Sequence, residues 1–323
     1  MNRVLFFICV GWTALLVGCS ASDVTTLGDW ITKSDLDGVS RSAATGFIIG
    51  NVAYIGTGVS SSNELLKDFW AYDQSTNAWT QMANFGGVAR SAGVGFAVGT
   101  KGYVGTGADA NTTRLKDFWE FDPTANTWVQ IADFGGTARR NAVAFAVNDK
   151  GYVGTGYDGN YLKDFWTYDP ETASWEKTTS FGGSKRIGAV SFVINNIAYV
   201  ATGTNGSALT DVWAYDPAQD LWIEKDEFDT DNGEYVARSY GVGFAIGTRG
   251  YITVGDGSAT VWQYNPDADS WAEFGVFEGG TRLNAFGFAI NGKGYITTGI
   301  NSTTSYDDLW EFDPTIEQDT DSN

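Results

Sequence analysis

Apolar and polar residues alternate in short stretches along the chain, and no stretch has the spacing of an amphipathic helix. In the first part of the chain, four such stretches lie at about 43–49, 52–56, 68–72 and 78–82. They are bounded by Gly, Asn, Asp and Ser, which favour turns. This pattern predicts an all-β protein built from short strands.

The same pattern recurs six times. Each unit has a phenylalanine that follows an arginine by six residues and precedes a tyrosine by seven. The phenylalanines, spaced 44 to 52 residues apart, are Phe47, Phe96, Phe145, Phe192, Phe244 and Phe288. The arginines are Arg41, Arg90, Arg139, Arg186, Arg238 and Arg282. Four strands in a unit of this length are typical of one β-propeller blade. The repeat predicts a six-bladed β-propeller with four antiparallel strands per blade.

Two further features place the strands within each blade. The stretch before each phenylalanine is rich in Gly, Ala and other small residues, which suits an innermost strand near the axis of the ring. The third stretch starts with Asp-x-Trp in five units, and Thr260 replaces the aspartate in the fifth. A second tryptophan marks the fourth stretch, where diverging blades leave room for a large ring.

The last unit lacks its second tryptophan, because residue 319 is aspartate. Trp30 precedes Arg41 by the same interval that separates Trp79 from Arg90. We therefore expect residues 29–33 to supply the outer strand of the last blade. Closure of the ring in this way removes two exposed sheet edges.

The N-terminus has the pattern of an export signal. Arg3 precedes an uncharged run, Val4–Val17, that is short for a membrane span. The run ends in Leu16-Val17-Gly18-Cys19, which resembles a bacterial lipobox and implies lipidation of Cys19. The alternative is a simple secretory signal. These features predict a lipoprotein signal peptide at 1–18, a lipidated tether at 19–28, the propeller at 29–316 and an acidic tail at 317–323.

Composition excludes several classes of function. The chain has 39 acidic and 20 basic residues, a net charge of −19, and no histidine. Nucleic acids and anionic membrane surfaces bind basic footprints, so neither is expected as a partner. Without histidine, Ser-His and Cys-His nucleophiles and His-ligated metals are excluded. No cofactor is expected.

The glycine, tyrosine and tryptophan pattern of the four-stranded units resembles the Kelch repeat of galactose-oxidase-type propellers and animal Kelch adaptors. Here the double glycine of that repeat is mostly Thr-Gly, as at Thr57-Gly58. The copper site of galactose oxidase needs His ligands and a Tyr-Cys crosslink, which the mature chain lacks. Bacterial six-bladed Kelch proteins also include a sialic-acid mutarotase, but only the blade template matches, so no catalytic residue is predicted.

Two hypotheses remain open for the six arginines. In animal Kelch adaptors, arginines at the matching positions grip acidic peptides at the channel mouth, so the resemblance implies a ligand-binding ring. Alternatively, each arginine pairs with the aspartate of Asp-x-Trp, because a residue repeated in every blade serves something that every blade needs. In the fifth blade, Asp256 and the acids of the nearby insertion are candidate partners for Arg238, which is otherwise free for a ligand.

Residues that break the repeat are the other candidates. Tyr157, Asp158 and Tyr161 form an aromatic and polar loop tip that is suited to stacking on sugars, and Arg114 is another non-repeated tip. The insertion between the fourth and fifth units carries Asp229, Asp231 and Glu234, whose hard oxygen ligands make it a weak Ca²⁺ candidate. The alternative for the insertion is a solvated acidic loop.

The leading hypothesis is a non-catalytic binding module, lipid-anchored at the outer membrane or surface of a bacterium. It would present the loops on the arginine side to a glycan or an envelope protein, and would touch the membrane only through its anchor. The alternative is a carbohydrate-active enzyme of mutarotase or lyase type, with tyrosine and carboxylate acid–base groups. A structural spacer is the third possibility.

Overall fold

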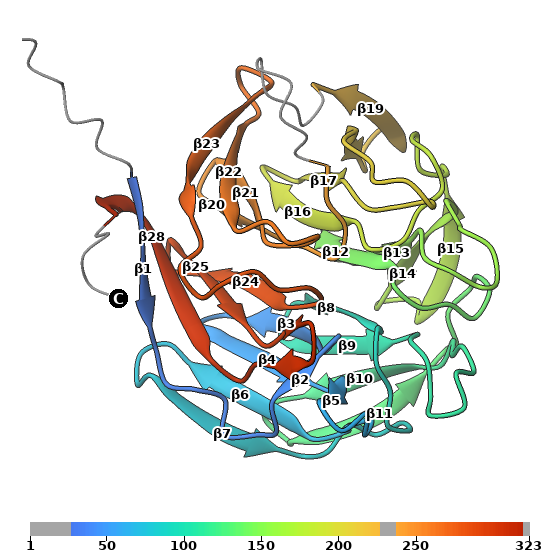
Figure 1. The fold of residues 1–323 in the computed structure, drawn as a ribbon. Coiled ribbons are helices and arrows are strands. Elements are labelled where there is room, and N and C mark those ends of the chain that lie inside the picture. The colour runs from blue at the N-terminus through green and yellow to red at the C-terminus, as the bar shows by residue number, and fades with distance from the viewer. Residues whose placement is uncertain (1–26, 227–236, 319–323) are drawn as a thin grey trace, which may run out of the picture.

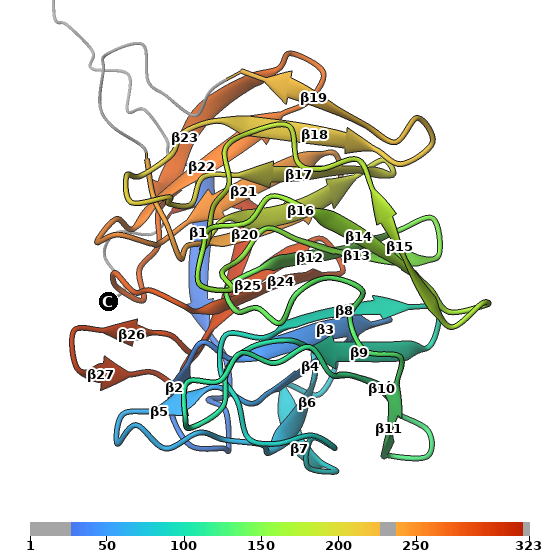
Figure 2. The ribbon, with the colours of Figure 1, turned by 90° about the vertical axis from the view of Figure 1, so that its right-hand side faces the viewer.

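The computed structural model describes residues 27–226 and 237–318 of the chain, drawn in colour in Figure 1. Six sheets of four antiparallel strands are arranged in a ring (Figure 1), which Figure 2 shows from the side, and their inner strands line a central channel. The prediction of an all-β, six-bladed propeller is confirmed. None of the described segments forms a helix long and apolar enough to cross a membrane. The predicted signal peptide, Cys19 and the calcium candidates lie outside the described residues.

The first three blades follow the chain from their inner to their outer strand. Blade 1 contains β3 (Thr45–Ile49), β4 (Val52–Gly56), β6 (Phe69–Asp73) and β7 (Ala78–Met82). Blade 2 contains β8 (Val94–Val98), β9 (Lys101–Gly105), β10 (Phe118–Asp122) and β11 (Thr127–Ile131). Blade 3 contains β12 (Val143–Val147), β13 (Lys150–Gly154), β14 (Phe165–Asp169) and β15 (Ser174–Thr178).

The last three blades include the one that closes the ring. Blade 4 contains β16 (Val190–Ile194), β17 (Ile197–Ala201), β18 (Val212–Asp216) and β19 (Leu221–Lys225). Blade 5 contains β20 (Val242–Ile246), β21 (Arg249–Thr253), β22 (Thr260–Asn265) and β23 (Ser270–Val276). Blade 6 contains β24 (Phe286–Ile290), β25 (Lys293–Thr297), β28 (Leu309–Glu317) and β1 (Leu27–Thr32). Short pairs form between β2 (Arg41–Ser42) and β5 (Val59–Ser60), and between β26 (Ile300–Asn301) and β27 (Thr304–Ser305).

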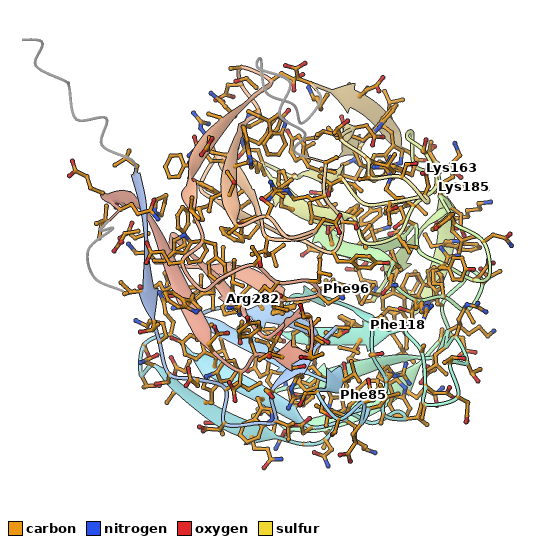
Figure 3. All side chains as sticks on the ribbon, viewed as in Figure 1. Phe85, Phe96, Phe118, Lys163, Lys185 and Arg282 are labelled. Atoms are coloured by element: carbon orange, nitrogen blue, oxygen red, sulfur yellow. The ribbon has the colours of Figure 1, made fainter. Side chains whose placement is uncertain are left out.

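Close packing between blades explains the small residues of the repeat. A Cβ atom on Gly95 of β8 would lie 2.5 Å from the carbonyl oxygen of Gly46 on β3, so the inner strands approach each other closely. The repeated phenylalanine packs into the next blade, since a Cβ atom on Gly102 would lie 2.0 Å from the ring of Phe47. Figure 3 shows side chains filling the space between the blades, with Phe96 nearer the channel than Phe118. The predicted order of strands from the axis outwards is confirmed.

Outer tryptophans join neighbouring blades through hydrogen bonds. Trp128 of blade 2 donates from its indole nitrogen to the carbonyl oxygen of Ala83, which follows the outer strand of blade 1 (3.1 Å). The backbone N–H of Ala83 donates in turn to the side-chain oxygen of Asn126 (2.8 Å). Trp79, Trp175, Trp222 and Trp271 make the equivalent indole bond. These bonds satisfy backbone groups that a blade edge would otherwise leave unpaired.

The N-terminal strand closes the ring as predicted. β1 pairs antiparallel with β28, and Thr32 lies opposite Trp310. Trp30 is 3% exposed and packs against Phe277 of blade 5 and Phe312 of blade 6, each with ring centroids 4.7 Å away. The strand spans residues 27–32 rather than 29–33, because a bulge between Leu27 and Asp29 extends its pairing with β28.

Replacement of Trp30 by alanine removes this buried indole. We expect Trp30→Ala to lower the free energy of unfolding by about 3–5 kcal/mol, because it leaves a cavity between blades 5 and 6. The neighbouring Ile31 is 47% exposed, so the matched variant Ile31→Ala is expected to cost less than about 1 kcal/mol. Urea denaturation measures both. Equal losses would show that β1 is not a packed part of the ring.

Candidate functional site

The six repeated arginines start the blades and are the largest polar side chains in the core. Each is at most 2% exposed. In five blades the guanidinium group pairs with the aspartate of Asp-x-Trp in the same blade, through hydrogen bonds of 2.5–2.8 Å. The same aspartate accepts a bond from the indole of its own Asp-x-Trp tryptophan at 2.7–2.9 Å. The partners are Arg41–Asp68, Arg90–Asp117, Arg139–Asp164, Arg186–Asp211 and Arg282–Asp308.

Each arginine also holds a backbone turn in an unfavourable conformation. Its Nη1 donates to the carbonyl oxygen of the residue before the repeated glycine, as Arg90 does to Thr106 (2.9 Å). Thr106 has φ of 57°, a left-handed value that is costly for a β-branched side chain. The guanidinium group of Arg90 further lies 4.7 Å from the ring centre of Phe85. Where this chain has Thr-Gly in place of the Kelch double glycine, the buried arginine therefore stabilises the left-handed backbone of the threonine.

These contacts support the second hypothesis for the arginines. A ligand-binding ring would need guanidinium groups that face solvent, and all six are buried. Arg238 of blade 5 has no aspartate at the position of Thr260 and instead donates to the carbonyl oxygens of Val254 and Thr260. Burial lowers the pKa of Arg238 to about 10, and the negative charge of Asp256 opposes that shift. We therefore do not place a ligand on the arginine ring.

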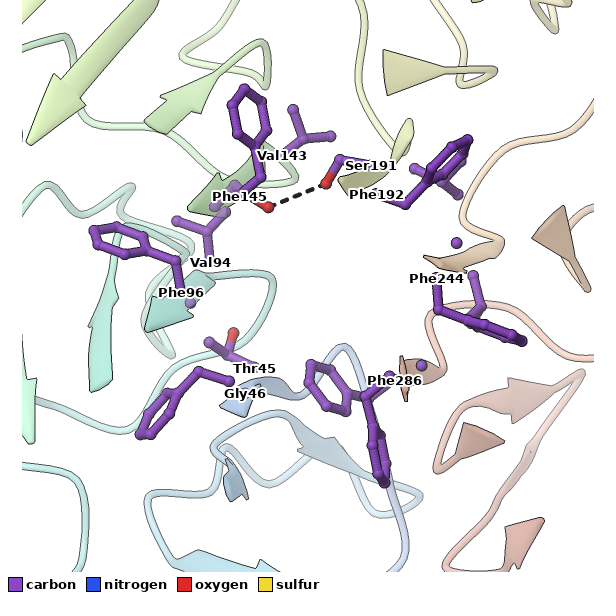
Figure 4. Close-up of a pocket in the computed structure, with 18 of the residues that line it drawn as sticks. Thr45, Gly46, Val94, Phe96, Val143, Phe145, Ser191, Phe192, Phe244 and Phe286 are labelled. Atoms are coloured by element: carbon purple, nitrogen blue, oxygen red, sulfur yellow. Dashed lines mark hydrogen bonds between the residues drawn. The ribbon is translucent and has the colours of Figure 1, made fainter. Parts of the chain in front are cut away.

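The channel mouth on the arginine side is formed by the residues two positions after these arginines. Their backbones are hydrogen-bonded head to tail into a closed ring: Ala43, Ala92, Asn141, Gly188, Tyr240 and Asn284. All six have positive φ, between 51° and 61°. Behind the mouth lies a channel of about 520 Å³. Figure 4 shows its wall of inner-strand residues, with the rings of Phe96, Phe145 and Phe192 directed away from it.

One residue separates the repeated arginine from the mouth ring, and this position varies from blade to blade. It is paired through backbone hydrogen bonds or a bridge with the residue after the repeated glycine in five blades. The pairs are Ser42–Val59, Ser91–Ala108, Arg140–Tyr157, Ile187–Thr204 and Leu283–Ile300. In blade 5, the Asp256 carboxylate instead accepts both hydrogen bonds of Ser239. The scaffold thus holds six variable positions around the mouth.

Among these pairs of variable residues, the pair of blade 3, Arg140 and Tyr157, is chemically distinctive. The guanidinium carbons of Arg114 and Arg140 lie 5.1 Å and 6.0 Å from the ring centre of Tyr157. Tyr161 contacts Tyr157 edge-on, with ring centroids 5.7 Å apart. All four side chains are half-buried. Three loop segments therefore bring two cations and two tyrosines together beside the mouth: the β9–β10 loop, the connection from β11 to β12 and the β13–β14 loop. We call these four residues the Arg-Tyr cluster.

Tyr240 extends towards this cluster across the mouth. A Cβ atom on Gly188 would lie 2.9 Å from the Tyr240 ring, so a glycine here leaves room for that ring. Burial raises the pKa of the Tyr240 hydroxyl, while the positive charge of Arg140 opposes the rise. The charges of Arg140 and Tyr161 in blade 3 also act on the pKa of Tyr240 in blade 5, and only Gly188 of blade 4 separates the two blades in the mouth ring.

Of the three predicted loop residues, the structure places the two tyrosines in the cluster and gives Asp158 a different role. Tyr157 and Tyr161 lie in the cluster, whereas Asp158 accepts bonds from the backbone N–H of Asn160 (3.0 Å) and the hydroxyl of Thr137 (3.0 Å). Asp158 therefore shapes the loop. Sequence reasoning missed Arg140 and Tyr240 as site residues. Comparison of the positions directly after each repeated arginine would have singled out Arg140, because it is the one cation among them.

No group of three or more potential metal ligands occurs within residues 27–226 and 237–318. The predicted Ca²⁺ ligands, Asp229, Asp231 and Glu234, are outside these ranges, so the calcium hypothesis stays a prediction.

A ring of four-stranded blades with variable residues around one channel mouth defines a β-propeller of the Kelch type. Residues 49–255, more than half of the chain, match the KLHDC2/KLHL20/DRC7 Kelch-repeats domain, and the chain belongs to this family. The fold is also similar to a solved structure described as "Structure of YjhT", with a TM-score of 0.73 and 16% identity over 86% of this chain and 95% of that one. No curated protein matches the sequence.

The pairing of Arg90 with Asp117 is testable by removing the charge of the aspartate. We expect Asp117→Asn to lower the free energy of unfolding by about 3 kcal/mol, because it leaves a buried guanidinium group without its counterion. Lys116 and Asp133 form an ion pair with side chains 52% and 46% exposed. The control variant Lys116→Ala is therefore expected to change stability by less than about 1 kcal/mol. Urea denaturation distinguishes these outcomes, and similar effects would contradict a central role for the buried pair.

The same carboxylates predict acid sensitivity. Burial alone would raise the pKa values of Asp68, Asp117 and Asp164, but the hydrogen bonds and charges of their arginines outweigh it and lower them. Their stabilisation is complete above the unfolded Asp pKa of about 4 and is lost as the pH falls towards the lower folded values.

Urea denaturation of wild type and Asp117→Asn across this range tests the prediction. The stability difference between the two proteins should shrink as the pH falls below about 4, because asparagine does not titrate. A difference that stays constant with pH would contradict the assignment of a lowered pKa to Asp117.

Proposed function

We propose that this Kelch propeller is a non-catalytic binding module whose arginine-side channel mouth receives a glycan or protein partner. The single observation that carries the proposal is the Arg-Tyr cluster. Its four residues break a sixfold repeat that is otherwise closely kept, and they do so on loops that a rigid scaffold positions. Tyrosine and arginine are the residue types most enriched where proteins bind partners.

The proposal includes the cell envelope as the place of action. The lipobox-like sequence ending in Cys19 supports a lipid anchor, and only seven residues lie between Cys19 and the start of β1 at Leu27. Such a tether spans at most about 30 Å when extended. The propeller would then work close to the membrane that holds its anchor.

The chemistry of the mouth favours binding over acid–base catalysis. A general acid or base works best with a pKa near the working pH. Burial instead raises the pKa of the Tyr240 hydroxyl. Asp256 is engaged by the backbone N–H and hydroxyl of Ser239, at 2.5 Å and 2.8 Å. These side chains offer hydrogen-bonding and stacking surfaces for a ligand.

A glycan array probed with the purified domain (residues 27–323) tests the proposal. We expect the double variant Tyr157→Ala/Tyr161→Ala to lose about tenfold or more in affinity for each glycan bound, because truncation of a tyrosine that anchors a partner costs about 1 kcal/mol or more. Lys150 lies at the β12–β13 turn on the opposite face, where it pairs with Asp169 (3.0 Å). Lys150→Ala is the matched control and should bind as wild type does. Binding that depends on Lys150 and ignores both tyrosines would overturn the proposal.

A further inference from the structure

We infer that the Arg-Tyr cluster seats a single carboxylate on an otherwise neutral sugar chain, as in a glycan that contains isolated uronic acid residues. This inference rests on the proposed function and specifies the ligand of the same site. It concerns Arg114 and Arg140, which are outside the buried ring of repeated arginines.

The geometry leaves the terminal Nη donors of both arginines without a partner among the described residues. A guanidinium group that lies over an aromatic ring uses its face, while its N–H groups point outwards in its own plane. Arg114 and Arg140 both lie over Tyr157, at 5.1 Å and 6.0 Å from its ring centre. Their N–H edges therefore lie around one aromatic ring, an arrangement that suits bidentate contact with a planar carboxylate.

The two arginines differ from the six repeated ones in lacking an acidic partner. Over the part of the chain that the structure describes, neither Arg114 nor Arg140 forms an ion pair with a carboxylate. The Nε of Arg114 is buried and makes no hydrogen bond to any described residue. A half-buried cation gains most from a ligand that supplies the missing negative charge, because desolvation strengthens the attraction between them.

The charge of the whole protein limits the ligand to an isolated anion. The net charge of −19 repels an extended polyanion such as a polyglutamate peptide. Attraction is local to the cluster, so a ligand with one carboxylate and an uncharged body fits best. Tyr161 of the cluster and the neighbouring Tyr240 offer aromatic faces and hydroxyl groups, which suit the C–H faces and hydroxyls of neutral sugar rings.

Isothermal titration calorimetry with two matched trisaccharides tests the inference. One carries a single glucuronate between neutral sugars, and the other is its carboxyl-reduced form, in which a hydroxymethyl group replaces the carboxylate. We expect the acidic trisaccharide to bind about tenfold or more tightly than the reduced one, and to weaken as salt is raised. Arg114→Gln and Arg140→Gln should each abolish most of that preference. Arg249→Gln is the control, since Arg249 lies at the β20–β21 turn on the opposite face.

The outcomes separate this inference from the proposed function. If both trisaccharides bind equally and Tyr157→Ala weakens both, the inference that the cluster binds a carboxylate is wrong, and the proposed binding function of the channel mouth is supported. If hexaglutamate binds more tightly than the acidic trisaccharide, the partner is an acidic peptide and the inference is overturned. It is also overturned if the acidic trisaccharide does not bind. Thermal unfolding of each variant shows whether a loss of binding reflects a loss of folding, and in that case Arg140→Lys, which keeps the charge, provides the decisive comparison.

Discussion

The buried ion pair between the first arginine of a blade and the aspartate of its third strand is the interaction on which the ring depends. In blade 2, Arg90 bonds both oxygens of Asp117, the carbonyl oxygen of Thr106 and the face of Phe85. One side chain thereby ties together the inner strand, the left-handed turn after the second strand and the start of the third. A buried guanidinium group is costly unless nearly all its donors are used, so its neighbours are repeated with it. In blade 5, where Thr260 replaces the aspartate, Arg238 donates to the backbone carbonyl oxygens of Val254 and Thr260.

This arrangement separates the residues that build the mouth from those that vary around it. The repeated arginine fixes the backbone, and the next residue is directed to the rim, where its identity is free to vary. Blade 2 has Ser91 at this position and blade 3 has Arg140, although the backbones around them are paired in the same way. A sixfold symmetric scaffold therefore presents an asymmetric surface. The Arg-Tyr cluster and Tyr240 occupy blades 2, 3 and 5, while blade 6 offers Leu283 and Ile300.

The mouth ring, whose six residues have left-handed φ values, also combines a repeated backbone conformation with side chains that vary. Its backbone bonds run from Ala43 through each blade to Asn284 and back, so the ring closes on the inside as β1 closes it on the outside. Glycine is the residue that adopts such φ values at least cost, yet Gly188 is the one glycine among the six residues of the mouth ring. At this position a side chain would collide with Tyr240, so the glycine makes space for a neighbour as well as meeting the backbone requirement.

The sequence by itself determined the number of blades, their four strands and the strand that closes the ring, because each of these depends on local periodicity and on spacing that repeats six times. The pairing of arginine with aspartate was one of two possibilities in the sequence, since spacing along a chain does not say which way a guanidinium group points. Only the tertiary structure decided it, by burying all six arginines and placing five of them against the aspartate of the same blade. It also brought Arg114 of one blade onto Tyr157 of the next and turned Tyr240 towards Arg140. Such contacts join residues from different repeats, and the curvature of the closed ring sets them rather than any interval in the sequence.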